Sequence, residues 1–248
     1  MHKNDGVVLL VITKSFSLSF AVFAFMLSLT WDHGTGLADS SVRSFLVPEF
    51  QEVRGHVSTE ARLFPQEQVL PGQSRHQVSI AVEPQYYMEW SNYTSLTITP
   101  FARLDFADSR RTHVDMRELL LRVVPGDWEL AVGFGKVFWG VAESKHLVDI
   151  INQTDIIESL DGEDKFGQPM VNLSISYDWG FVDFFVMPYF RERIFPSRSG
   201  RLRGAVLVDA GQSRFRSGAE RWHPDFAVRY SNNIGGWDIG VSHFYGTN

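Results

Sequence analysis

The chain has 248 residues, of which 44% are hydrophobic and 21% are charged, and it contains no cysteine. Its net charge of −6 argues against general affinity for nucleic acid, and the missing cysteine excludes disulfides, thiolate metal sites and thiol catalysis. The mean hydropathy of −0.11 suits a soluble domain, but it equally suits strands that alternate a lipid-facing side with a polar lumen side. Patterns along the chain have to separate these two classes.

Residues 1–38 are predicted to be a signal peptide. Basic residues precede an apolar stretch, Phe16–Trp31, and the small residues Gly36 and Ala38 fit a cleavage site. The weaker alternative is a retained membrane helix, which needs about 20 apolar residues and is therefore longer than this stretch. Residues 39–52 then form a periplasmic lead before the strands, which occupy residues 53–248.

Nine strands are predicted after this lead. The clearest is Gln77–Trp90, whose even positions are apolar and whose odd positions are mostly polar over 14 residues. Such a length suits a tilted strand that crosses a bilayer, which needs about 9–11 residues. The other predicted strands are 53–64, 96–105, 114–124, 128–140, 171–177, 181–190, 225–231 and 237–245.

The connections between these strands alternate in length. Short turns follow every second strand, at 91–95, 125–127, 178–180 and 232–236, and longer loops follow the others. This alternation predicts an all-β fold, an antiparallel transmembrane up-and-down β-barrel of the bacterial outer membrane. Such single-chain barrels have even strand numbers. We therefore expect a partial barrel of about nine strands from a larger one, with the C-terminal part truncated.

Tryptophan supports the membrane interpretation. One indole lies in or beside each of the four short turns, and indoles prefer the boundary between membrane and water. Soluble antiparallel sheets also place aromatic residues near turns, which is the alternative. The predicted aromatic girdle consists of Trp90, Trp128, Trp179 and Trp237.

Some residues disturb the strand pattern. Pro84, Pro100 and Pro188 lie inside predicted strands, where each removes a donor from the hydrogen-bond ladder. The alternation in the strand 114–124 also changes phase near Arg117 and Glu118. We expect β-bulges at these places.

Two long loops carry opposite charges, −5 for 141–168 and +5 for 191–223. A pore constriction needs opposed fixed charges, so we expect the acidic loop to fold into the lumen and face arginines. The predicted constriction residues are Asp149, Asp155, Glu158, Asp161 and Asp164 on the loop, and Arg54, Arg62, Arg103 and Arg122 on the wall.

The alternative is that both loops lie outside the barrel. There they would be solvated, or their arginines would bridge lipopolysaccharide phosphates. The predicted extracellular arginine cluster consists of Arg191, Arg193, Arg198, Arg201 and Arg203. Four isoleucines of the acidic loop need burial and favour its infolding, whereas the arginine-rich loop suits either location.

The stretches Leu130–Ser144, Asp149–Asp155 and Asp161–Pro169 resemble a largely uncharacterised group of porin-like outer-membrane barrels of Gram-negative bacteria, similar to alginate-export porins. Phe185–Arg193 and Trp237–Gly246 continue the resemblance, which covers about residues 50–248. It implies export to the cell outer membrane. The implied partners are outer-membrane lipid, lipopolysaccharide, the barrel-assembly machinery and small solutes, with no nucleic acid.

The predicted function is a channel for diffusion of small polar or charged solutes, without cofactor or metal. The alternative is a non-conducting, loop-plugged scaffold or surface-binding protein. A secreted β-sandwich would have to bury polar faces, and the long strand Gln77–Trp90 disfavours it. We do not expect an enzyme, because the adjacent Ser242 and His243 point to opposite sides of a strand and cannot form a catalytic pair.

Overall fold

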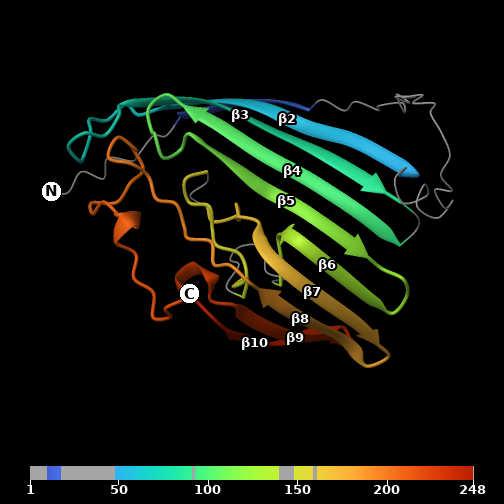
Figure 1. Cartoon of the computed structure of the whole chain (residues 1–248). Helices are drawn as coiled ribbons and strands as arrows, with labels where there is room; N and C mark the ends of the chain where they lie inside the picture. Colours follow the sequence, from blue (N-terminus) through green and yellow to red (C-terminus); the bar gives the residue numbers. More distant parts are fainter. Residues whose placement is uncertain (1–9, 18–47, 91–92, 140–147, 159–160, 248) are drawn as a thin grey trace, which may run out of the picture.

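The computed structural model describes residues 10–17, 48–90, 93–139, 148–158 and 161–247. These residues form one antiparallel sheet in which each strand pairs with the next along the chain (Figure 1). The strands are β1 (Leu10–Ser17), β2 (Phe50–Leu63), β3 (His76–Glu89), β4 (Thr94–Asp105), β5 (His113–Val123), β6 (Trp128–Gly135), β7 (Gln168–Tyr177), β8 (Gly180–Met187), β9 (Asp225–Ile234) and β10 (Trp237–Tyr245).

Two short 3-10 turns, η1 (Ala210–Gln212) and η2 (Glu220–Trp222), interrupt the loop between β8 and β9. In the described part of the chain, no helix has the length and apolar character needed to cross a membrane.

The all-β, antiparallel, up-and-down architecture is confirmed, and β2 to β10 correspond to the nine predicted strands. Among the described residues β1 and β10 do not pair with each other, so the sheet is open and does not close into a barrel by itself. The partial membrane barrel expected from the sequence stays a prediction. β1 pairs with β2 along its whole length and lies in the segment predicted to be a signal peptide. The signal peptide expected over residues 1–38 stays a prediction.

Two strands are shorter than predicted. β6 ends at Gly135 and β8 ends at Met187, just before Pro188. Proline has no N–H to donate and therefore ends the ladder there. The chain beyond both points is free to leave the sheet.

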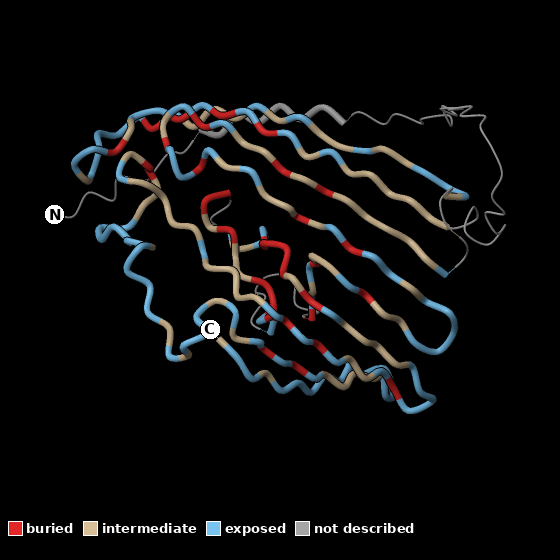
Figure 2. Tube along the Cα trace, in the orientation of Figure 1, coloured by how far each residue is buried: buried red, intermediate tan, exposed pale blue. Residues whose placement is uncertain are grey.

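The two faces of the sheet show the reverse of the polarity usual in a water-soluble protein: apolar side chains are exposed on one face, and polar side chains are buried on the other. On β3, Val78, Ile80 and Val82 are exposed, with 47%, 42% and 39% of their surface accessible, whereas Gln77 and Ser79 are buried at 3% and 1%. We call the face that carries Ile80 the outer face and the face that carries Ser79 the inner face. Figure 2 shows how buried and exposed positions alternate along the strands.

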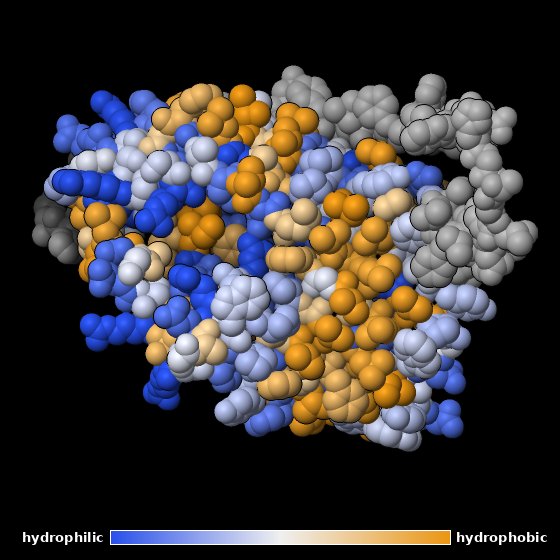
Figure 3. Space-filling view, viewed as in Figure 1, coloured by the Kyte–Doolittle hydropathy of each residue, from blue (hydrophilic) through white to orange (hydrophobic). Residues whose placement is uncertain are grey.

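The apolar outer face extends across the sheet. Hydrophobic residues gather over the strands in the view of Figure 3, and hydrophilic residues gather toward the long loops. Exposed large hydrophobic residues of this face include Leu104, Val114, Leu119, Leu121, Val132, Val171, Phe184, Val186, Phe226, Val228, Ile239 and Val241. Water is a poor solvent for such a surface.

A β-bulge lies where the sequence predicts one. The β4–β5 ladder shifts its register between Thr99 and Pro100, and Arg117 is the additional residue on β5. The β3–β4 ladder has no paired residues around Pro84. A bulge re-aims the side chain that it carries, and here it places Arg117 among the buried residues of the inner face.

A small hydrophobic core attaches the acidic loop to the inner face. Trp139 and Ile151 of the loop pack with Phe185 and Met187 of β8, and the rings of Trp139 and Phe185 lie 5.6 Å apart. Gly135 leaves room for Met170, another member of this core, because a Cβ atom there would lie 2.4 Å from the Met170 side chain. This core holds the loop in front of the polar inner face.

Candidate functional site

The described part of the acidic loop folds against the inner face of the sheet. Asp155 is fully buried, and Asp149 and Glu158 are buried as well. Asn152 fixes the base of the loop by donating to the carbonyls of Gly135 and Phe166, at 2.8 Å each. The small hydrophobic core around Trp139 therefore positions the carboxylates of the loop against the inner face of the sheet.

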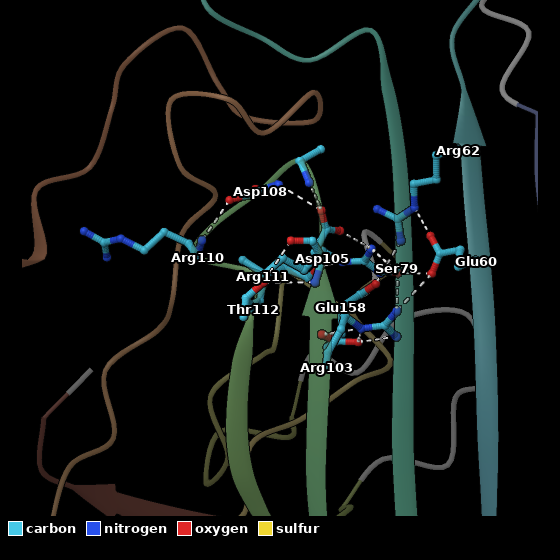
Figure 4. Close-up of polar contacts among 12 residues, drawn as sticks. Glu60, Arg62, Ser79, Arg103, Asp105, Asp108, Arg110, Arg111, Thr112 and Glu158 are labelled. Atoms are coloured by element: carbon cyan, nitrogen blue, oxygen red, sulfur yellow. Dashed lines mark hydrogen bonds and ion pairs between the residues drawn. The ribbon is translucent and has the colours of Figure 1, made fainter.

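Glu158 meets Arg103 of β4 in a bidentate pair. The Arg103 Nε donates to both Glu158 carboxylate oxygens, at 3.0 and 2.7 Å, and Nη2 lies 2.7 Å from Oε2 (Figure 4). Arg62 of β2 donates to the Glu158 backbone carbonyl at 3.2 Å. Planar pairs of this kind are strong and directional, so the loop tip is held in one position.

Glu60 of β2 is shared by three guanidinium groups (Figure 4). It pairs with Arg62, with Arg111 at 2.9 Å, and with Arg103 at 3.6 Å. Arg111 also pairs with Asp105 at 3.0 Å and donates to the backbone carbonyl of Ile157 at 2.8 Å. The connection between β4 and β5 is thus bound to both the wall and the loop.

Arg111 keeps its positive charge in this buried position. Burial acts to lower the pKa of its guanidinium, but the carboxylates of Glu60, Glu158 and Asp105 outweigh it and raise that pKa above its usual value. Arg111 therefore stays charged at any physiological pH.

A second cluster lies around the β5 bulge. Arg117 donates to Asp155 at 2.6 Å and lies 3.3 Å from Asp115. Asp115 also pairs with Arg191, whose other nitrogen donates to the carbonyl of Gly167. The Arg117 guanidinium sits over the ring of Phe101, 4.3 Å from its centroid. A cation between carboxylates and an aromatic face is well stabilised away from water.

Together the two clusters are close to neutral. We call their members the inner charge network; they are Arg62, Arg103, Arg111, Arg117 and Arg191 with Glu60, Asp105, Asp115, Asp155 and Glu158. Desolvation of such groups costs several kcal/mol per ion, so a buried network adds little net stability but makes the loss of one member expensive.

The structure brings together some of the residues predicted to line a constriction and leaves others apart. Asp155, Glu158, Arg62 and Arg103 belong to the inner charge network. Asp149 is buried elsewhere, where it accepts from the backbone N–H of Trp139. The other four lie outside the network: Asp161 and Asp164 are exposed, Arg54 pairs with Glu52, and Arg122 pairs with Glu129.

Sequence reasoning missed half of the network. The missed members are Glu60, Asp105, Arg111, Asp115 and Arg117. Glu60 and Asp105 occupy inward positions of the predicted strands, so their alternation with apolar residues was an available signal. Arg111 is in a loop and Arg117 is displaced by the bulge, and alternation locates neither.

Arg54 and Arg122 provide a first test, because their side chains are 57% and 46% exposed. Replacing either by glutamine is expected to change the free energy of unfolding by less than about 1 kcal/mol, since exposed ion pairs contribute little. Urea unfolding followed by tryptophan fluorescence measures this. A loss of 3 kcal/mol or so would place these pairs in a water-excluded site.

The arginine-rich loop is divided between two roles. Arg191 belongs to the inner charge network, and Arg193 donates to Gln153 of the acidic loop. Arg201 donates to backbone carbonyls of the loop between β2 and β3, and so does Arg203. Arg198 is exposed. The predicted arginine cluster thus fastens neighbouring loops, while Arg193 and Arg198 present exposed positive charge; its extracellular location stays a prediction.

The four tryptophans of the predicted girdle lie at the sheet end that carries the short turns. Trp128, Trp179 and Trp237 are exposed, and Trp90 is partly buried. Trp179 stacks on Tyr177, with ring centroids 4.8 Å apart, and contacts Tyr230. This row of aromatic rings has the position that a membrane boundary would require, although its role stays a prediction.

No family model, curated protein or solved structure matches the chain. Among the described residues, no group of three or more histidines, aspartates or glutamates is placed to hold a metal ion. What the described residues do show is a set of fixed, paired charges on the sheet and on a loop held against it.

Proposed function

We propose that this chain forms part of the wall of an outer-membrane β-barrel whose lumen is narrowed by the acidic loop, and that it serves as a porin-like channel for small polar or charged solutes. One observation carries the proposal. The outer face of the sheet is apolar and exposed, whereas the inner face of β3, β4 and β5 carries buried polar and charged residues and lies against a loop.

The energetics favour lipid as the partner of the outer face. Moving a fully exposed large apolar side chain out of water contributes about 1.5–3 kcal/mol. The outer face carries more than ten such side chains that are partly exposed, and each would contribute a fraction of that amount in lipid. Within the part of the chain that the structure describes, the outer edges of β1 and β10 have no partner strand, and hydrocarbon does not tolerate unpaired backbone groups. The proposal therefore includes further strands that cover these edges and complete the wall.

The inner charge network supplies the narrowing. It fastens the acidic loop to β2, β4 and β5 through Glu158 and Asp155, so that the loop occupies space in front of the inner face. Solutes would pass beside this loop, along fixed charges of both signs. The resemblance of the chain to porin-like barrels of Gram-negative bacteria agrees with this arrangement and with the expected outer-membrane location, lipopolysaccharide contacts and assembly route.

A specific observation also favours the alternative function, a non-conducting scaffold plugged by its loops. The carboxylates of the acidic loop contact the wall arginines directly and are buried, rather than facing them across a gap. Directly paired charges produce only a weak field in the remaining lumen. The same network could therefore close the barrel.

Conductance in planar bilayers separates the two functions. The natively extracted protein is added under a salt gradient, and single-channel steps are recorded. Discrete steps support the channel, and the reversal potential reports which sign of charge dominates the lumen. A folded, heat-modifiable protein that gives no steps would exclude the channel and support the plugged scaffold.

A matched pair of valines tests the membrane placement. Val171 lies on the outer face of β7 with 39% of its surface exposed, and Val206 lies in a loop with 81% exposed. We expect Val171→Arg to lower the free energy of unfolding in lipid vesicles by about 2–4 kcal/mol, because a charge on a lipid face is costly. Val206→Arg should change it by less than about 0.5 kcal/mol. Equal, small effects would argue that the outer face lies in water.

A further inference from the structure

A groove of about 940 Å³ opens on the outer face. Val82, Ala102, Val114 and Met116 line it, and these side chains belong to the outer faces of β3, β4 and β5. The volume lies at the upper end of the range typical of small-molecule sites, about 300–1,000 Å³. An apolar groove in an apolar surface suits the hydrocarbon chain of a ligand.

The groove exists because the sheet is interrupted there. β6 pairs with β5 only over Leu119–Val123, so no strand of the described residues pairs with the first half of β5 on that side. The chain after β8 crosses this place instead, and Tyr189 and Trp222 meet edge to face with ring centroids 4.8 Å apart. Two segments that are far apart in the sequence thus form one side of the groove.

Four prolines line the groove, Pro84, Pro100, Pro169 and Pro188. Proline carries no backbone N–H, so an interrupted ladder at these positions leaves fewer unsatisfied donors. Unsatisfied donors are costly in hydrocarbon. A proline-rich border therefore lowers the number of unpaired backbone N–H groups at this opening, although backbone carbonyls remain there.

Of the described residues that line the groove, two are charged, Asp115 and Arg191, and they pair with each other. Asp115 Oδ2 is buried without a hydrogen bond and lies 3.3 Å from Nη1 of Arg117. If an incoming anion bound Arg191, Asp115 could keep Arg117 as its counter-charge. The guanidinium of Arg191 would then offer a planar edge that matches a carboxylate.

We propose that this groove binds a single-chain amphiphile with a carboxylate head group, a long-chain fatty acid in chemical class. The apolar chain lies along Val82, Ala102 and Val114, and the carboxylate pairs with Arg191. The bound carboxylate replaces Asp115 as the partner of Arg191, and Asp115 then pairs with Arg117 alone. A carboxylate adds one negative charge to the network, whereas a phosphomonoester would add up to two, which favours the carboxylate. The inference rests on the proposed function, because the ligand reaches the groove from the lipid that surrounds the outer face.

The test uses the full chain in lipid vesicles and a long-chain fatty acid that carries a diazirine, with its methyl ester as the uncharged control. After illumination, peptide mapping locates the adducts. We expect adducts of the acid on β4, β5 and the segment from Pro188 to Trp222. The double variant Asp115→Asn, Arg191→Met removes both charges of the pair and leaves no new unpaired charge. It should reduce labelling by the acid about tenfold and leave labelling by the ester unchanged.

A second variant tests the apolar part. Ala102→Trp fills the groove and should reduce labelling by both probes, whereas Val228→Trp, on the outer face away from the groove, should reduce neither. Labelling that spreads evenly over the outer face, or that Ala102→Trp does not change, would overturn the inference. A chain that fails to float with vesicles overturns the proposed function, whereas an inserted chain with evenly spread labelling overturns this inference alone.

Discussion

Replacing Asp155 by asparagine is expected to lower the free energy of unfolding by about 3 kcal/mol, because it leaves the buried Arg117 without its nearest counter-charge. Asp155 has no exposed surface, and its carboxylate lies 2.6 Å from the Arg117 guanidinium. The substitution preserves the size of the side chain, so the loss reports charge rather than packing. Urea unfolding followed by tryptophan fluorescence measures it.

The control for this prediction is Asp161→Asn. Asp161 lies on the same loop and is exposed, and its substitution should change the free energy of unfolding by less than about 0.5 kcal/mol. Conductance adds a second readout, since a loop released from β5 should widen the lumen and increase the single-channel current. If Asp155→Asn matched Asp161→Asn in stability, the loop would not be held by the wall through this pair.

The second prediction concerns Glu60, which three arginines share. Glu60→Gln turns a balanced group, Glu60, Asp105 and Glu158 against Arg62, Arg103 and Arg111, into one with an excess positive charge. We expect a loss of about 3 kcal/mol in the free energy of unfolding, because like charges then face one another with little water to screen them. Urea unfolding in detergent micelles measures this loss.

Ion selectivity provides the functional readout of the same variant. In a conducting barrel, the reversal potential of Glu60→Gln under a salt gradient should shift toward anion selectivity. Glu52→Gln on the same strand is the matched control, since the partner of Glu52, Arg54, is 57% exposed and the pair is screened. A stability loss as large for Glu52→Gln would contradict the distinction between buried and exposed pairs.

Much of the sheet could be predicted from the sequence. Alternation places Val78, Ile80 and Val82 on one face, and a side-chain period of two residues needs no knowledge of distant contacts. The turns, the interruptions at proline and the phase change near Arg117 can also be recognised from a few neighbouring residues. The opposite charges of the two loops made an infolded acidic loop a reasonable expectation.

The partners of each charge could not be predicted in this way. Glu158 reaches Arg103 and Asp155 reaches Arg117 only because the core around Trp139 sets where the loop lies. Arg191 enters the network from a loop that the sequence equally allowed outside. Such pairs join residues 38 to 76 positions apart, and no local pattern encodes their distance.

The sequence by itself determined the strands, their facing and the charge carried by each loop, because hydrophobic periodicity and turn chemistry act over a few residues. Only the tertiary structure decided three further features: the sheet remains open in the described residues, Arg54 and Arg122 lie away from the network, and a groove forms where β5 lacks a neighbour. Each of these depends on which segments meet after folding. That choice is made by packing and desolvation over the whole sheet, which act between residues that are distant in the chain.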